Sequence, residues 1–341
     1  MNISALSPPR QLHLTTSGQL SLMLLVTLIL GLVHLIEGPR DIPFSSLAHA
    51  IIDYDPNNFE QRVLIALRLP RVTAILLAGI CLAIAGYLMQ LTLANRLCEP
   101  HILGLNAGAS LMVVSLTAFP IVPLIGPLRP LAASIGAAIM FSMVLTLASS
   151  GRKGLQALKL IFCGIAFSTL ANAISATILL LDENTLDELR FWLVGDGASA
   201  QLSTVLAGLP FIGLAVLMSL LLLPQLNAMS LGDNMARGLG ASVKLTRFFA
   251  LCAAALLSGT AVSLVGPIGF VGLISPSIWR GVHARPTLQS MLLIALTGAS
   301  LLLAADLAAT SIISPQELPT GALTGLVGAP VFMWIFTRRI R

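Results

Sequence analysis

Ten long apolar runs follow one another along the chain, and they constrain its fold more than any other feature. A helix that crosses a membrane needs about 20 apolar residues, so 341 residues have room for about ten spans with short connections. Lipid offers the backbone no hydrogen-bond partners, which leaves helices or closed barrels. The runs are continuous and rich in Leu and Ala, without the alternation of barrel strands. They occupy residues 19–36, 72–93, 104–120, 129–149, 158–181, 202–224, 247–265, 268–282, 288–308 and 319–337.

The composition agrees with a surface covered mostly by lipid. Hydrophobic residues make up 56% of the chain and charged residues only 10%, whereas a soluble protein has roughly a quarter of its residues charged. The sequence therefore predicts an all-α polytopic membrane protein with about ten transmembrane helices, in a single transmembrane domain over residues 1–341.

The placement of the basic residues predicts the orientation of the spans. Of the 19 Lys and Arg residues, thirteen fall on the side of the N-terminus and six on the opposite side. Cytoplasmic segments of membrane proteins carry such an excess. We therefore expect residues 1–18 and the C-terminus to be cytoplasmic, and the net charge of +5 to reflect this asymmetry beside membrane lipid rather than nucleic-acid binding.

The longest cytoplasmic connection, residues 225–246, is predicted to contain a short helix that docks on a partner. Leu231, Met235 and Leu239 recur every four residues and therefore share one helical face. Asp233 near the start and Arg237 near the end complement the helix dipole and are spaced to pair with each other. A connection without a partner gains nothing from an exposed apolar face; the alternative is an ordinary solvated connector.

The sequence lacks the motifs of an enzyme. It contains no G-x-x-x-x-G-K-[ST] for nucleotide, no H-E-x-x-H for zinc and no G-x-S-x-G for a nucleophile. The five histidines are scattered and are interpreted as interfacial or loop residues, and the four cysteines as small hydrophobes. We expect no catalytic residues, no metal and no cofactor. Asp306, the one carboxylate within an apolar run, is interpreted as a structural hydrogen-bonding residue.

A Gly-Pro-x-Gly sequence at residues 266–269 separates two apolar runs. A helix broken at membrane depth is tolerated only where protein or a water-filled cavity covers its backbone. Two interpretations stay open: a kink beside a transport path, or a tight turn.

Ordered motifs from residue 68 to residue 330 resemble the FecCD family of ABC permeases, whose members import ferric siderophores, haem and vitamin B12. The motifs are Arg-Leu-Pro-Arg at 68–71, Glu-Pro at 99–100, Leu-Gly-Leu-Asn-Ala-Gly-Ala at 103–109, Cys-Gly-Ile-Ala-Phe-Ser at 163–168, Phe-Trp-Leu-Val-Gly at 191–195, Leu-Gly-Asp at 231–233, Ala-Arg at 236–237, Leu-Gly at 239–240, Gly-Pro-Ile-Gly-Phe-Val-Gly-Leu at 266–273, Ala-Asp-Leu at 305–307, Glu-Leu-Pro at 317–319 and Gly-Ala-Pro at 328–330.

The resemblance implies the fold of a type II importer permease in a bacterial inner membrane. Its partners would be a second permease protomer, identical or paralogous, two cytoplasmic ATPases and a periplasmic binding protein. Arg68 and Arg71 match residues that dock the binding protein, and Asn95 and Leu97 match a cytoplasmic gate loop. The stretch that couples to the ATPase is matched by Leu231, Gly232, Asp233, Met235, Ala236, Arg237, Leu239 and Gly240.

The chain departs from the family pattern at three positions. Arg96 follows Asn95 where proline is usual, Ser277 follows Pro276 where histidine is usual, and Thr310 lies where an arginine commonly provides a further docking contact. We expect a ferric siderophore as cargo, with haem and vitamin B12 as alternatives. An ion-coupled secondary carrier is the alternative of another class, which the scarcity of mid-span ionisable residues disfavours; a membrane enzyme is disfavoured further.

Overall fold

The structure is a computed structural model, and it describes residues 15–37, 43, 46–47, 50, 55, 57–119, 128–150, 157–280, 285–313 and 316–340, with side chains to residue 334. Within these residues all regular structure is helical, so the predicted all-α class is confirmed. The helices are α1 (Thr16–Ile36), α3 (Phe59–Val63), the π-helical turn η1 (Leu64–Arg68), α4 (Leu69–Thr92), α5 (Leu105–Ala118), α6 (Leu128–Ser149), α7 (Ala157–Leu181), α8 (Glu183–Leu189), the 3-10 turn η2 (Trp192–Val194), α9 (Leu202–Met229), α10 (Asp233–Gly238), α11 (Val243–Val265), α12 (Val271–Trp279), α13 (Leu288–Ser311) and α14 (Thr320–Ile340).

Each of the ten apolar runs contains one helix. Seven helical stretches in the described residues are long and apolar enough to cross a membrane: α1, the continuous stretch Phe59–Thr92, α6, α7, α9, α11 and α13. The other three runs form α5 and α12, which are shorter, and α14, which has 21 residues. The prediction of about ten membrane helices thus corresponds to these seven stretches and the three further helices.

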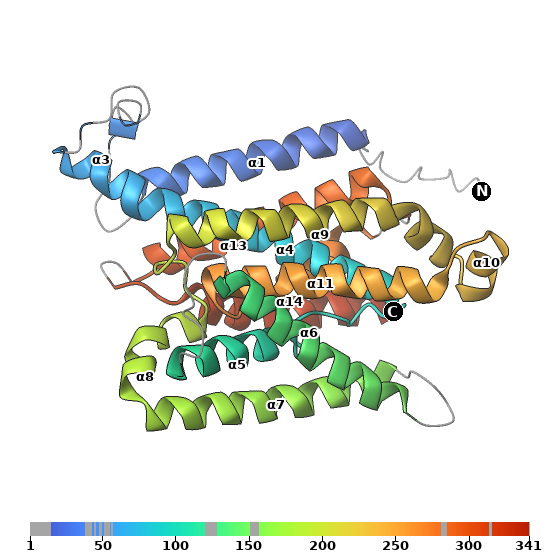
Figure 1. Cartoon of the computed structure of the whole chain (residues 1–341). Coiled ribbons are helices and arrows are strands. Elements are labelled where there is room, and N and C mark those ends of the chain that lie inside the picture. Colours follow the sequence, from blue (N-terminus) through green and yellow to red (C-terminus); the bar gives the residue numbers. More distant parts are fainter. Residues whose placement is uncertain are drawn as a thin grey trace, which may run out of the picture.

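The helices form an inner group covered by an outer group (Figure 1). In α4 and α11, 78% of the most apolar window is buried inside the protein, and in α13 the share is 61%. The corresponding share is only 17% in α1 and α7 and 33% in α9. Because these outer helices are as apolar as the inner ones, their exposed faces suit lipid rather than water.

Glycine allows the central helices to approach closely. A Cβ on Gly86 of α4 would lie 2.0 Å from the carbonyl oxygen of Gly272 in α12, and one on Gly79 would lie 2.5 Å from that of Gly298 in α13. Without side chains, the backbones pack in direct contact, which is how small residues stabilise helix pairs in membranes.

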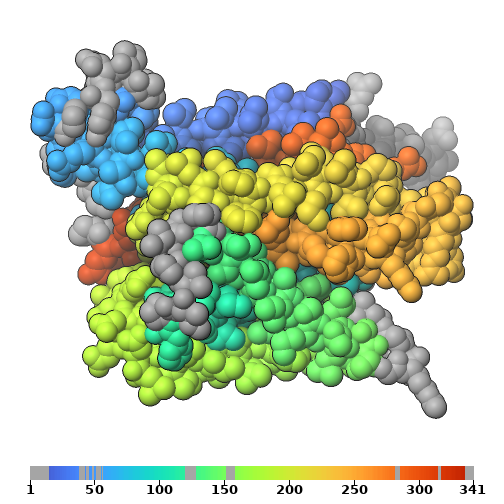
Figure 2. Space-filling model, viewed as in Figure 1, coloured from blue at the N-terminus to red at the C-terminus, as the bar shows by residue number. Residues whose placement is uncertain are grey.

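The two ends of the bundle carry different short elements. In Figure 1, α3 and α8 lie at one end, called here the α8 end, and α10 lies at the other, called the α10 end. Helix α1 begins at the α10 end, and Figure 2 shows α10 projecting there beyond its neighbours. Most of the expected N-terminal segment 1–18 lies outside the described residues.

The predicted break near residue 266 is present. Helix α11 ends at Val265 and α12 begins at Val271, and between them Gly266 and Phe270 adopt positive φ angles of 76° and 70°. Such a conformation is unusual for a residue with a side chain, so the surrounding packing holds Phe270 in place.

Candidate functional sites at the two ends of the bundle

At the α8 end, a fully buried carboxylate joins four helices. Asp306 of α13 has no exposed surface. It accepts hydrogen bonds from His34 Nε2 of α1 at 2.5 Å and from Arg71 Nε of α4 at 2.8 Å. The hydroxyl of Thr320, at the start of α14, donates to the same carboxylate. A buried charge is costly unless it is paired and hydrogen-bonded, and these donors meet that requirement. The interpretation of Asp306 as a structural hydrogen-bonding residue is confirmed.

The expected role of His34 as an interfacial or loop residue is wrong. Its side chain is 5% exposed and lies inside the bundle against Asp306. The sequence could not show this, because 272 positions separate the two residues along the chain.

Arg71 extends this network toward the surface. Its Nη1 donates to Glu317 Oε2 at 2.6 Å, and its Nη2 lies 4.0 Å from a carboxylate oxygen of Asp196. The side chain of Arg71 is 11% exposed, whereas that of Glu317 is 29% exposed. The guanidinium therefore lies beneath the surface, among three acidic side chains of its own chain.

Arg68, the other predicted docking residue, lies one helical turn before Arg71. Its Nη1 donates to the backbone oxygens of Leu35 and Ile36 at 2.8 and 2.7 Å. These carbonyls are at the C-terminal end of α1, where the helix leaves them without an internal partner. Arg68 thus caps α1 from the neighbouring helix.

At the α10 end, the predicted gate loop follows α4 directly. Ala94 has a positive φ of 49°. The side-chain oxygen of Asn95 accepts from the backbone N–H of Leu97 at 3.0 Å, and the Asn95 carbonyl accepts from that of Cys98. The loop is therefore a compact turn. The Asn95 amide nitrogen is buried and has no partner among the described residues.

Glu99, just beyond this loop, is buried and has no charged partner in the part of the chain that the structure describes. Its side chain is 2% exposed, and its Oε2 has no hydrogen-bond partner among the described residues. Burial raises the pKa of this carboxyl to about 8, although a hydrogen bond from the backbone N–H of Phe270 opposes the shift. A neutral carboxylic acid is the form that this environment favours.

Helix α10 presents the apolar residues that the sequence predicted. Leu231, Met235 and Leu239 are 66%, 59% and 64% exposed, while Ala236 on the opposite side is fully buried. The helix covers only Asp233–Gly238, so Leu231 and Leu239 flank it. The whole connection is also shorter than the expected 225–246, because α9 continues to Met229 and α11 begins at Val243.

Two glycines set the ends of α10. Gly232, directly before it, and Gly240, two residues after it, have φ angles of 102° and 84°. These angles are accessible to glycine at little cost and strained for other residues. These backbone angles therefore explain why glycine occupies both positions in the predicted coupling stretch.

Asp233 and Arg237 are spaced to pair with each other, as the alternative of a solvated connector would have them, but Asp233 pairs elsewhere. Asp233 instead receives Arg247 of α11, whose Nη2 lies 3.2 Å from its Oδ1. Arg247 Nε also donates to the backbone carbonyl of Thr92, the last residue of α4, at 2.9 Å. No local spacing in the sequence links Arg247 to Asp233 or to Thr92, so the sequence alone does not predict either contact.

A cavity of about 430 Å³ separates the gate loop from the base of α10. The residues that line it include Ala94, Asn95 and Arg96 on one side, and Met229, Ser230 and Gly232 on the other.

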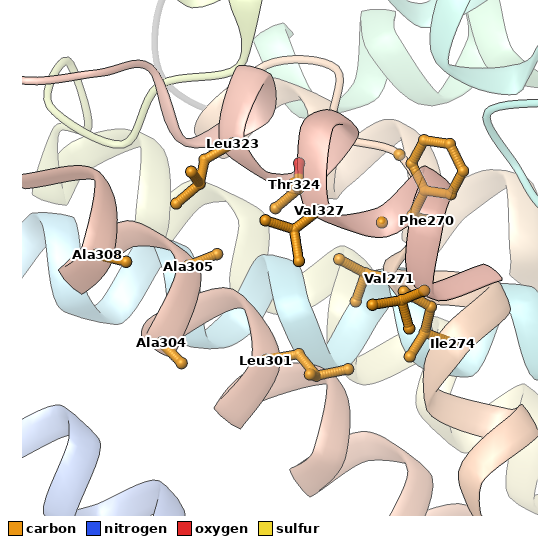
Figure 3. Close-up of a pocket in the computed structure, with 13 residues that line it drawn as sticks. Phe270, Val271, Ile274, Leu301, Ala304, Ala305, Ala308, Leu323, Thr324 and Val327 are labelled. Atoms are coloured by element: carbon orange, nitrogen blue, oxygen red, sulfur yellow. The ribbon is translucent and has the colours of Figure 1, made fainter. Parts of the chain in front are cut away.

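A second cavity, of about 300 Å³, lies beside the helix break. Figure 3 shows its lining from α12, α13 and α14, with Phe270 at one edge. Among the 13 lining residues the Thr324 hydroxyl is the one polar side-chain group, and none is ionisable. This wall offers weak apolar contacts and no ligand for a metal ion. Among the described residues, no group of three or more His, Cys, Asp and Glu side chains could hold a metal.

The motifs and this architecture agree with comparisons to known proteins. The family model of the FecCD transport family matches residues 24–338. The chain belongs to the FecCD transport family. The residues of the predicted sites all lie within the matched region.

Individual FecCD relatives cover almost the whole chain. The Fe(3+) dicitrate transport system permease protein FecD of Escherichia coli is 34% identical over 325 residues, which cover 94% of this chain and 99% of that protein. The vitamin B12 import system permease protein BtuC of Vibrio vulnificus is also 34% identical, covering 94% and 93%. A solved metal-chelate type ABC transporter in an inward-facing conformation matches with a TM-score of 0.76 at 25% identity, covering 94% and 98%. The family and the multi-pass membrane fold are therefore established together.

Proposed function

We propose that this FecCD family chain is the membrane-spanning permease subunit of an ATP-driven importer that carries a ferric siderophore across a bacterial inner membrane. The observation that carries the proposal is the exposed apolar surface of Leu231, Met235 and Leu239 on a projecting element of a transport-family protein. This surface lies at the bundle end where α1 begins (Figure 1). By the positive-inside rule, that end is cytoplasmic and so are both termini.

The proposed partner at the α10 end is an ATPase, one for each permease protomer. Complete burial of a Leu or Met side chain contributes roughly 1.5–3 kcal/mol, so a groove that covers these three residues gains substantial affinity. Because the sequence contains no nucleotide-binding motif of its own, the ATP would be hydrolysed by that separate chain. The second permease protomer, identical or paralogous, would complete the transport path.

The proposed partner at the α8 end is a periplasmic binding protein, with Arg68 and Arg71 as its docking residues. Both have partners within the chain. Direct contact of the binding protein with Arg68 would replace the hydrogen bonds of Arg68 to α1. Contact with Arg71 would replace its bond to Glu317, which is the more exposed of the acidic partners of Arg71. We propose that Asn95 and Leu97 act at the cytoplasmic gate, since their turn follows the end of α4 that Arg247 caps.

A ferric siderophore is proposed as cargo, and haem and vitamin B12 are the alternatives. Relatives named for iron dicitrate and for vitamin B12 are equally similar, at 34% identity. The apolar wall in Figure 3 suits weak contacts with a bulky chelate rather than direct metal ligation.

The cargo can be tested in cells that contain the permease with its ATPase and binding protein as their sole chelate importer. Uptake of a ferric siderophore is measured with excess unlabelled ferric dicitrate, haem or cobalamin as competitors. We expect ferric dicitrate to compete, and haem and cobalamin not to compete. Competition by haem or cobalamin alone would reassign the cargo.

A further inference from the structure

Arg247 makes the one side-chain bridge that the described residues show between the coupling element and the end of α4. It lies in the second turn of α11 and reaches in two directions. Its Nη2 contacts both carboxylate oxygens of Asp233 at the start of α10, at 3.2 and 3.3 Å, and its Nε donates to the carbonyl of Thr92.

The Thr92 end of this bridge lies directly before the gate loop. Thr92 is fully buried and ends α4, whose apolar window is 78% buried. Only Leu93 and Ala94 separate it from Asn95, and Ala94 has the strained φ of 49°. A displacement of the Thr92 carbonyl would therefore act at the junction between the buried helix α4 and the gate loop that follows it.

Helix α10 packs mainly against α9 and α11 rather than against α4. The cavity of about 430 Å³ lies between residues 94–96 and the base of α10, so direct packing does not fill that space. In contrast, a hydrogen bond of 2.8 Å from the Thr246 hydroxyl to Gln225 fastens α11 to α9. Helices α9 and α11 are thus joined at their bases, and both also pack along α4; Arg247 adds a polar contact at the end of α4.

The same contacts would also suit a simple helix cap, and their energetics separate the two roles. Arg247 and Asp233 are 32% and 43% exposed, and exposed pairs contribute little to stability. Loss of the pair should therefore leave the fold intact while it removes a connection between two elements. A cap alone needs only the Thr92 contact, whereas a connection also needs Asp233.

We propose that Arg247 is a positioning residue that transmits displacement of α10 to the end of α4 and thereby to the gate loop. This inference rests on the proposed function, because the displacement originates in an ATPase bound at α10. It predicts that ATP hydrolysis and transport separate when either contact of Arg247 is removed.

The test uses the full complex in proteoliposomes, with Arg247→Gln, Asp233→Asn and the double variant. Lys244→Gln is the matched control, since it removes an exposed positive charge one turn earlier on the same helix. The measurements are ATPase association, ATP hydrolysed, ferric siderophore transported, and the separation of spin labels at Leu97 in the two protomers. Coupling between sites commonly amounts to roughly 5- to 150-fold, so we expect transport per ATP to fall at least about fivefold in both single variants.

The double variant should resemble the single ones, because both remove one connection, and the spin-label separation should cease to respond to ATP. Unchanged transport per ATP in Arg247→Gln overturns the inference, as does a loss confined to Arg247→Gln with normal Asp233→Asn, since the latter outcome means a cap alone. Loss of ATPase association in Asp233→Asn also overturns it. If Arg247→Gln does not fold, Asp233→Asn decides. Wild-type protein that transports without ATP refutes the proposed function itself, a result distinct from normal coupling in the variants.

Discussion

Replacement of Asp306 by Asn tests whether the buried network holds the α8 end together. The substitution preserves size but removes the negative charge that Arg71 and His34 face. The amide would also direct an NH₂ group, which can only donate, toward side chains that are themselves donors. The fold would lose the charge that pairs Arg71 and would retain a buried donor without an acceptor.

The size of the effect follows from burial and from what remains. Removal of one partner from a buried pair costs about 3–5 kcal/mol. Arg71 keeps Glu317 as a partner in the variant, so we expect the lower end, about 3 kcal/mol. For a chain of 341 residues, that loss corresponds to a decrease of about 4 °C in apparent Tm.

The assay is thermal unfolding of the purified protein in detergent, followed by the monodisperse fraction that remains after heating. The control is Asp187→Asn, which removes an exposed carboxylate whose pairing distance to Arg190 is 3.6 Å; it should change Tm by about 1 °C or less, as exposed pairs contribute little. An Asp306→Asn protein as stable as this control would refute the reasoning. The same network implies that Arg71→Glu disturbs folding, so docking is tested more cleanly by Arg68→Gln.

Three further predictions concern packing, pH and coupling. Gly86→Ala should destabilise by at least about 1–3 kcal/mol, because its Cβ would lie 2.0 Å from a Gly272 oxygen, whereas Gly31→Ala, with nothing within 4 Å, should be neutral or stabilising in the same unfolding assay. Glu99→Gln should remove a pH dependence of stability. The folded protein keeps the Glu99 proton up to pH about 8, whereas the unfolded chain loses it near pH 4.5, so the stability of the wild type falls across that interval. The free energy of unfolding of the variant should therefore exceed that of the wild type by about 2–4 kcal/mol at pH 7.5 but not at pH 4.5. A constant difference between wild type and Glu99→Gln at the two pH values would contradict this. Met235→Glu should release the ATPase or uncouple it, measured by co-purification and transport, while Asn234→Glu, which adds the same charge elsewhere on α10, should do neither.

The helices were predictable because membrane spans are determined by local sequence. A run of apolar residues must be helical in lipid, and each of the ten runs contains a helix. The break after α11 was visible as well, since residues 266–269 combine two glycines with a proline between two apolar runs. Exposed apolar residues around Met235 followed from helical spacing alone.

Side-chain partners between distant helices were not predictable. His34 and Asp306 are 272 positions apart, and Asp233 meets Arg247 rather than the nearer Arg237. Such pairs depend on which helices pack together, and the local periodicity of a sequence carries no information about that packing. The burial of Arg71 was unpredictable for the same reason. Its position in the sequence indicated the end of a span, but it did not indicate the three carboxylates that surround its guanidinium.

The central claim is that this chain forms part of an importer driven by ATP. The most direct measurement is uptake of a radiolabelled ferric siderophore into proteoliposomes that contain the permease, its ATPase and its binding protein, with no ion gradient across the membrane. We predict uptake that requires ATP and the binding protein and that vanadate abolishes. Uptake that continues without ATP and follows an imposed proton or sodium gradient would contradict the account and indicate a secondary carrier.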